Sequence, residues 1–116
     1  MQFVLCTCPA GVAMDMAHAV MDARVAAYVD IVSGTQRISR VRPGDEVSVQ
    51  ETAVLLMHTV EEKLGDLVKT LVAAGPMDTP PIIALSVYEG ATDFMRRIED
   101  EWTDTDASEM LQVGKG

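Results

Sequence analysis

The stretch Ala53-Val54-Leu55-Leu56-Met57-His58 decides the fold, because its first five residues are all apolar. Successive side chains of a strand point to opposite faces of the sheet, so a strand with one wet face alternates apolar and polar residues. In this stretch the side chains that point to either face are apolar, which predicts a strand buried on both faces. Gln2–Leu5 and Ile82–Val87 have nearly the same character. The chain must therefore cover two faces of one sheet.

Length and composition indicate a single globular domain. The chain has 116 residues, 48% of them hydrophobic, which is enough for a core and too many for a disordered chain. No apolar run approaches the ~20 residues of a membrane span, and the first residues lack the basic start of a signal peptide. The formal charge of −9 argues against nucleic acid, whose binding depends on neutralising phosphates. We expect a cytoplasmic protein without membrane or nucleic-acid partners.

Hydrophobic periodicity and turn signals predict the element order β-α-β-β-α-β, followed by a short third helix. The expected elements are a strand over Gln2–Thr7, a helix over Gly11–Ala27, a long hairpin from Tyr28 to about His58, a helix from Thr59 to Gly75, a strand over Ile82–Tyr88 and a helix over Thr92–Trp102. This order is that of the ferredoxin-like fold, in the α+β class. We expect residues 1–102 to form the domain and the polar, acidic residues 103–116 to form a tail.

The second helix has the clearest boundary signals. Thr59 and Glu62 make a Thr-x-x-Glu capping box at its start. Gly75-Pro76 is the expected stop signal at its end.

The fold class also predicts self-association. Right-handed crossovers place both main helices on the same face of the sheet. The other face then stays uncovered, although the central strands are apolar on it, and such a patch is too large for a soluble monomer. The simplest cover is a sheet from another copy, so we expect a homo-oligomer.

Four segments, in their order and spacing, resemble the CutA (divalent-cation tolerance) family. They are Thr7-x-Pro9, Arg24-Val25-Ala26-Ala27-Tyr28-Val29-Asp30-Ile31, Glu51 with Val54-Leu55-Leu56-Met57-His58-Thr59, and Pro81-Ile82-Ile83-Ala84-Leu85-Ser86-Val87-x-x-Gly90. The resemblance covers about residues 3–100. It implies a homotrimer whose sheets pack around a threefold axis. It also implies a role in tolerance of, or response to, copper or another divalent metal ion.

The chain departs from the family pattern where a ligand site would be sought. Tyr28-Val29-Asp30 replaces the usual Cys-Val-Asn, and His58 stands where lysine is usual. Ser39 and Val41 replace the tyrosine and tryptophan of the hairpin, and Gly75–Ile82 lacks the usual histidine and tyrosine. The resemblance therefore does not transfer metal ligands to Tyr28 or Gly75.

Cys6 and Cys8, the only two cysteines, are the first candidate metal ligands. Two residues apart in a strand, they share a face, which suits a soft ion such as Cu(I) and is awkward for a mutual disulfide. We expect Cys8, at the strand end, to be the more exposed. The alternative is that both are small buried hydrophobes.

Three more candidates, Asp15, His18 and Asp22, share a face of the first helix at i, i+3 and i+7. They can bind Cu(II) or Zn(II), or His18 can simply pair with the carboxylates on a solvated stripe. Met14, Met16 and Met21 resemble a copper-sensing set, although packing is the favoured interpretation at this spacing.

The last candidate, His58, ends its strand. In an antiparallel ladder between the first and third strands it lies beside Phe3 and far from Cys8, so one protomer cannot combine His58 with Cys8. The alternative is a structural, hydrogen-bonded histidine.

The sequence contains no recognisable catalytic set. It has no Gly-x-Ser-x-Gly elbow and no phosphate-cradling glycine loop, so we expect a protein that is not an enzyme. One alternative is a trimeric sensor of the nitrogen-regulatory PII type that binds nucleotide between subunits. Its positive charges would be Arg37, Arg40 and Arg42, which otherwise suit a neighbouring subunit's acidic surface. A ferredoxin-like dimeric enzyme of the monooxygenase or isomerase kind is the third hypothesis.

Overall fold

The order of elements in the structure, a computed structural model, is the predicted one, and residues 1–77 and 80–100 are described. The elements are β1 (Gln2–Pro9), the 3-10 turn η1 (Ala10–Val12), α1 (Ala13–Ala23), β2 (Tyr28–Ser39), β3 (Ser48–Thr59), α2 (Glu61–Ala74) and β4 (Ile82–Ser86). Residues 92–100 form a further helix. The end of the third predicted helix and the tail predicted over 103–116 lie outside the described residues.

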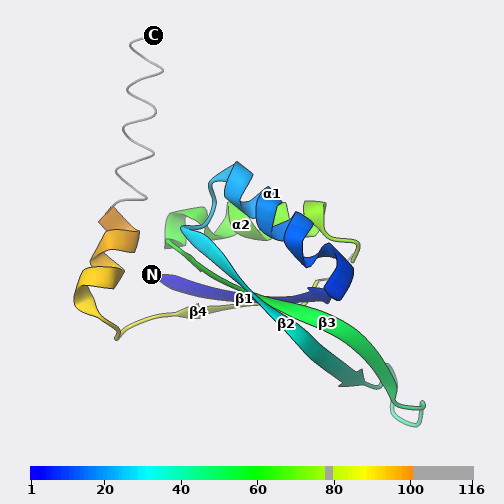
Figure 1. Cartoon of the computed structure of the whole chain (residues 1–116). Helices are drawn as coiled ribbons and strands as arrows, with labels where there is room; N and C mark the ends of the chain where they lie inside the picture. The colour runs from blue at the N-terminus through cyan, green and yellow to red at the C-terminus, as the bar shows by residue number, and fades with distance from the viewer. Residues whose placement is uncertain (78–79, 101–116) are drawn as a thin grey trace.

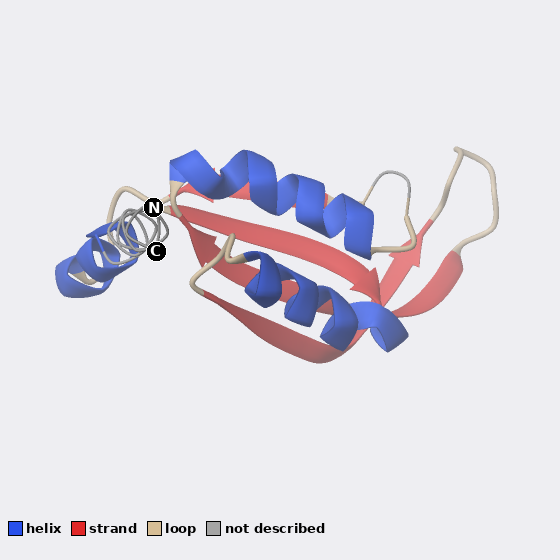
Figure 2. Ribbon diagram, turned by 90° about the horizontal axis from the view of Figure 1, so that it is seen from above, coloured by secondary structure: helices blue, strands red, loops and turns tan. Residues whose placement is uncertain are grey.

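The four strands form one antiparallel sheet in the order β2-β3-β1-β4. Both α1 and α2 lie side by side on the same face of this sheet (Figures 1 and 2). The α+β, ferredoxin-like architecture predicted from the sequence is therefore confirmed. The strands β1 and β3 occupy the centre of the sheet, whereas β4, whose run Ile82–Leu85 is also apolar, forms one edge.

The core lies between the sheet and the two helices. Its fully buried members come from β1, β3, α1 and α2, and they are Val4, Cys6, Leu55, Met57, Met16, Val20, Leu67 and Leu71. Burying a side chain of this size contributes about 1.5–3 kcal/mol to folding. The residues from the two helices recur at helical spacing, as the sequence predicts.

The first helix ends earlier than predicted. It stops at Ala23 rather than Ala27, because Arg24 adopts the left-handed conformation at φ 57° and its N–H bonds the Met21 carbonyl at 3.1 Å. Val25 and Ala26 then enter the core as a short connection. The prediction over Gly11–Ala27 failed because apolar residues in a buried connection extend a helical pattern without being helical.

The predicted capping box at the start of α2 is wrong. Thr59 is the last residue of β3 and is 1% exposed, and its hydroxyl donates to the Val25 carbonyl at 2.7 Å. A buried hydroxyl needs a partner inside the protein, and this carbonyl supplies it. Val60 takes the N-cap position without a side-chain bond, while Glu61 and Glu62 favour the positive end of the helix dipole. The predicted end at Gly75 is confirmed, since its N–H bonds Leu71 O at 3.0 Å.

The β2–β3 hairpin is longer than the helix layer and projects beyond it (Figure 1). The ladder runs from the pair Tyr28–His58 to the pair Ser39–Ser48, with a register shift between Val32 and Thr35. Gly34 lies in this shift at φ +79°, a conformation that glycine adopts without strain. The tip around Pro43-Gly44-Asp45 is exposed.

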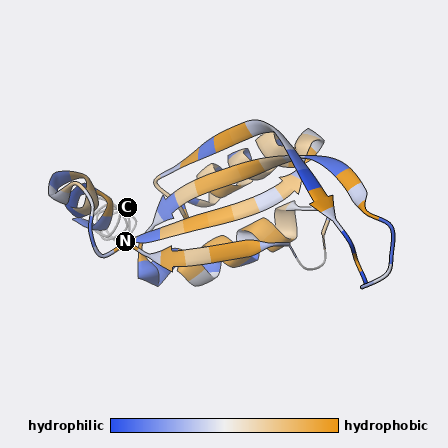
Figure 3. Cartoon of the chain, turned by 90° about the horizontal axis from the view of Figure 1, so that it is seen from below, coloured by the Kyte–Doolittle hydropathy of each residue, from blue (hydrophilic) through white to orange (hydrophobic). Residues whose placement is uncertain are grey.

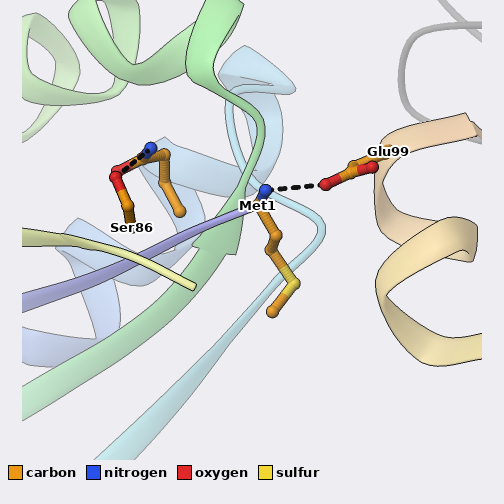
Figure 4. A network of polar contacts seen from close by, with 4 residues as sticks. Met1, Ser86 and Glu99 are labelled. Carbon is orange, nitrogen blue, oxygen red and sulfur yellow. Dashed lines mark hydrogen bonds and ion pairs between the residues drawn. The ribbon is translucent and has the colours of Figure 1, made fainter. Parts of the chain in front are cut away.

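The fourth strand ends at Ser86, two residues before the predicted end, and the chain then leads to the helix of residues 92–100. Gln2 Nε2 donates to Ser86 Oγ at 3.1 Å, and the Met1 amino group pairs with Glu99 Oε1 at 2.7 Å (Figure 4). These contacts place the 92–100 helix at the end of the sheet where β1 begins.

We call the face of the sheet opposite α1 and α2 the open face (Figure 3). Three cross-strand rows define it: Val32–Val54–Thr7, Asp30–Leu56–Leu5–Ile83 and Tyr28–His58–Phe3–Leu85. Ile83 and Leu85 are 58% and 52% exposed. The 92–100 helix contacts one end of this face, where Phe94 packs against Tyr28 and His58. An apolar second face without a lid is what the sequence predicts.

Candidate functional site

The two cysteines lie on the helix-facing side of β1. Cys6 is 0% and Cys8 1% exposed, and each thiol lies 3.8 Å from a backbone oxygen, that of Thr7 and that of Ala53 respectively. The predicted common face of Cys6 and Cys8 is confirmed. The expectation that Cys8 is exposed is wrong, because β1 continues to Pro9 and Cys8 pairs with Ala53 beneath the helices.

Burial also controls the chemistry of these thiols. It raises the pKa of Cys6 to about 11, with a smaller contribution from Cys8, while Arg37 acts in the opposite direction. Burial raises the pKa of Cys8 as well. The thiolate is the form that binds a metal ion. At neutral pH both groups are therefore protonated thiols within an apolar core.

The carboxylate–histidine stripe lies on the outer surface of α1. Ala13, Met16, Ala17 and Val20 turn inward, which leaves Asp15, His18 and Asp22 exposed to solvent. Within residues 1–77 and 80–100, no group of three or more His, Cys, Asp or Glu side chains is arranged to hold a metal ion. The stripe is therefore accessible, and its role as a metal site stays a prediction.

The third candidate, His58, lies among aromatic rings at one end of the open face. Its ring centroid is 5.1 Å from that of Phe3, 4.9 Å from that of Tyr28 and 5.6 Å from that of Phe94. The register pairs it directly with Phe3, whereas Cys8 pairs with Ala53. The prediction that His58 lies near Phe3 and far from Cys8 is confirmed.

The surroundings of His58 favour the neutral imidazole. Burial lowers the pKa of His58, and the Asp30 carboxylate offsets this only in part. Its Nδ1 atom is buried without a hydrogen-bond partner among the described residues. Adding a proton there would bury an unpaired N–H. The predicted alternative of a hydrogen-bonded structural histidine therefore does not hold at Nδ1.

Two neighbours of His58 were absent from the sequence-based candidates. Tyr28 lies opposite His58 in the hairpin. The register that begins with the Ser39–Ser48 pair would have placed Thr59 there, and the register shift between Val32 and Thr35 moves the pairing by one residue. Phe94 comes from the 92–100 helix, and no local pattern links it to β3. Burial, followed by the effect of Asp30, raises the pKa of the Tyr28 hydroxyl, so this group stays neutral.

The projecting hairpin carries the predicted basic residues together with exposed apolar ones. Arg40 and Arg42 are exposed and Arg37 is half-buried. Ile38 and Val49 pair across the hairpin and are 68% and 60% exposed.

The six candidate ligands do not meet in one place: the cysteines lie in the core, the α1 stripe on the outer surface and His58 on the open face.

These features define the class of protein: a ferredoxin-like domain with a bare apolar sheet face and a projecting hairpin. None of the helices in the described part of the chain is long and apolar enough to span a membrane. The sequence model of the CutA1 divalent ion tolerance protein matches residues 2–101. This chain belongs to the CutA1 family.

Individual relatives agree with this assignment. The divalent-cation tolerance protein CutA of Thermus thermophilus is 35% identical over 95 residues, which are 81% of this chain and 90% of that protein. The solved structure of the divalent cation tolerance protein Cut A1 from Thermus thermophilus has a TM-score of 0.74 at 32% identity, over 88% of this chain and 94% of that one. The PII-like protein CutA from Nostoc has a TM-score of 0.75 at 15% identity, over 84% and 93%. The Nostoc likeness shows the fold alone.

Proposed function

We propose that this chain is a non-enzymatic homotrimer that acts in the tolerance of, or response to, divalent metal ions, with copper as the principal ion. The observation that supports the assembly is the open face. Leu5, Leu56 and Ile83 form one continuous cross-strand row there, and no described helix covers that row. An apolar surface of this extent marks an association site.

A second copy of the chain is the natural cover for this face. Sheet-on-sheet packing joins two apolar faces with their side chains interdigitated. The threefold arrangement is the one that the family resemblance implies. The basic hairpin agrees with it, since Arg37, Arg40 and Arg42 form no ion pair with any described residue and the whole chain has a net charge of −9. The hairpin of one copy therefore complements the acidic surface of another.

The second part of the proposal, the response to metal ions, rests on family membership and on side chains that can bind a metal ion from solution. Asp15, His18 and Asp22 are the candidate ligands that an ion in solution can reach directly. Cys6 and Cys8 become available only when the core opens, and His58 lies on the surface that we assign to the subunit contact.

We further propose that residues 1–102 are the functional domain, that residues 103–116 are an acidic tail, and that the protein acts in the cytoplasm.

The experiment combines a solution mass with a metal-sensitivity assay. Light scattering over a hundredfold dilution should give the mass of three protomers throughout. Cells lacking the protein should be more sensitive to copper than cells expressing it, and fractionation should place it in the cytoplasm rather than the periplasm. A single-protomer mass refutes the assembly, a two-protomer mass favours the dimeric enzyme class, and unchanged copper sensitivity refutes the metal role.

A second candidate is a PII-like sensor of nucleotides or other small molecules. It is favoured by the unpaired arginines of the hairpin and by the structural likeness to the PII-like Nostoc protein. Phosphate recognition uses arginine because its planar fork matches phosphate oxygens. Titration of the intact assembly with ATP and ADP should then give saturable binding that falls in the Arg37→Gln/Arg40→Gln variant. A flat calorimetric trace eliminates this candidate.

A further inference from the structure

The solvent face of α1 carries two methionines that the core does not use. Met14 is 60% and Met21 41% exposed, whereas Met16 on the same helix is 0% exposed. Exposed apolar side chains are common when they stand singly. Met14 and Met21 do not stand singly, because the exposed His18 lies between them on the same helix surface.

The three residues form one narrow stripe. Positions 14, 18 and 21 stand at i, i+4 and i+7, and all three lie within α1 (Ala13–Ala23). Helical residues three and four apart are surface neighbours with Cβ atoms ~5–6 Å apart. Side chains on a helix lean toward its N-terminus. His18 therefore leans over Met14, and Met21 leans over the turn that holds His18.

The carboxylates lie on the other side of the same histidine. At about 100° per residue, Met14 and Met21 fall to one side of His18, whereas Asp15 and Asp22 fall to the other. His18 thus separates a thioether side from a carboxylate side, and the two sides suit different ions. Carboxylates prefer hard or borderline divalent ions, while thioethers select soft ones.

We propose that Met14, His18 and Met21 bind a soft monovalent cation, Cu(I) or Ag(I). The imidazole nitrogen and the thioether sulfurs are neutral donors, and the thioethers stay unprotonated at every pH. Asp15 and Asp22 attract the cation electrostatically without needing to coordinate it. This site deepens the proposed metal response, rests on it for its biological meaning, and names the reduced form of copper as the ion.

The buried thiols are the principal competitors for such an ion. Cys6 and Cys8 lie beneath the helices at 0% and 1% exposure, so an ion from solution meets the α1 stripe first. Binding at the stripe leaves the core closed, whereas binding at the thiols requires it to open. The two modes therefore differ in which methionine methyl groups sense the ion.

The test titrates Ag(I) nitrate, in chloride-free buffer, into the intact assembly labelled with 13C at the methionine methyl groups. The methyl resonances of Met14 and Met21 should shift, whereas those of the buried Met16 and Met57 should not. Resonances are assigned with the single Met→Leu variants. The Met14→Leu/Met21→Leu variant should bind Ag(I) more than about tenfold more weakly.

Two variants serve as matched controls. Met16→Leu removes a buried thioether from the same helix, and Asp15→Asn/Asp22→Asn removes the carboxylates while keeping both exposed thioethers. Each should keep the methyl shifts, and the Asp variant should weaken binding by less than the methionine variant. Loss of the shifts only in the Asp variant overturns the thioether assignment.

Silent Met14 and Met21 resonances, or shifts confined to the core methionines, also overturn the proposal and point to the thiols. The outcome is separable from that of the proposed function. If Ag(I) does not bind at Met14, His18 and Met21, the copper-sensitivity assay still tests the proposed function. If Ag(I) binds there but loss of the protein leaves copper sensitivity unchanged, the metal-response role is refuted and the binding site remains.

Discussion

Phe3 and His58 face each other across the β1–β3 ladder, with ring centroids 5.1 Å apart. Tyr28 and Phe94 close around the same imidazole. This contact places a titratable group in apolar surroundings, on the sheet face that we assign to subunit association. The physical consequence is a dependence of stability on pH.

Stability should fall on acidification because of His58. Its pKa in the folded chain lies below the ordinary value of 6.5, so the unfolded chain binds a proton that the folded chain does not. Stability linked to this group is complete above about pH 6.5 and is lost as the pH falls toward the lower, folded pKa. Urea unfolding at fixed protein concentration between pH 7.5 and 5 should show a declining midpoint.

The His58→Gln variant should flatten this dependence. His18→Gln is the matched control, since it removes the other histidine of the chain, an exposed one, and should leave the slope unchanged. Equal slopes in the wild type and His58→Gln would contradict the assignment.

A charge on the open face should break the assembly. Leu56 lies in the row that joins Asp30, Leu5 and Ile83, and an aspartate there would bury a carboxylate between sheets. We expect Leu56→Asp to dissociate the oligomer to single protomers at micromolar concentration, as measured by light scattering. Val72→Asp places the same charge on α2, where Val72 is 41% exposed, and should leave the mass unchanged.

The thiols should be inert in the folded protein. Both are buried, and the pKa of Cys6 is about 11, so the reactive thiolate is scarce at pH 8. Iodoacetamide should label neither thiol of the native protein within an hour and both after unfolding in guanidinium chloride. Rapid native labelling of Cys8, followed by peptide mass spectrometry, would contradict the burial of that residue.

Loss of the Thr59 hydroxyl should destabilise the fold. Its bond to the Val25 carbonyl at 2.7 Å joins the end of β3 to the connection after α1. The Thr59→Val change keeps the shape and leaves that carbonyl without this donor, which should lower the free energy of unfolding by about 1–3 kcal/mol. Thr70→Val removes a hydroxyl that donates to Asp66 O on the helix surface and should change it by less than about 0.5 kcal/mol. Similar losses in both variants would contradict a special role for Thr59.

Most of the sheet could be predicted from the chain because its signals are local. The apolar runs predicted strands at β1, β3 and β4, and the turn Pro43-Gly44-Asp45 predicted the hairpin of β2 and β3. The antiparallel register then placed His58 beside Phe3 without further information. Side chains two residues apart in a strand must share a face, so the common face of Cys6 and Cys8 followed as well.

The sequence-based predictions failed where a contact with a distant segment decides the surroundings of a side chain. Thr59 has a good capping sequence, yet its hydroxyl bonds Val25 because a buried donor takes the carbonyl packed against it. Cys8 was expected at an exposed strand end, but β1 continues to Pro9 and Cys8 pairs with Ala53 in the core. Neither partner is near in sequence, so no local pattern contains the information.

The sequence by itself determined the order of elements, their pairing and the presence of hydrocarbon on both sides of the sheet, since these depend on periodicity and on turns of a few residues. Only the tertiary structure decided which groups are buried together. It enclosed the thiols in the core, brought Phe94 against His58, and left Met14 and Met21, for which packing was favoured, facing solvent. The reason is physical: periodicity assigns a side chain to a face, whereas burial depends on which distant segment packs against that face.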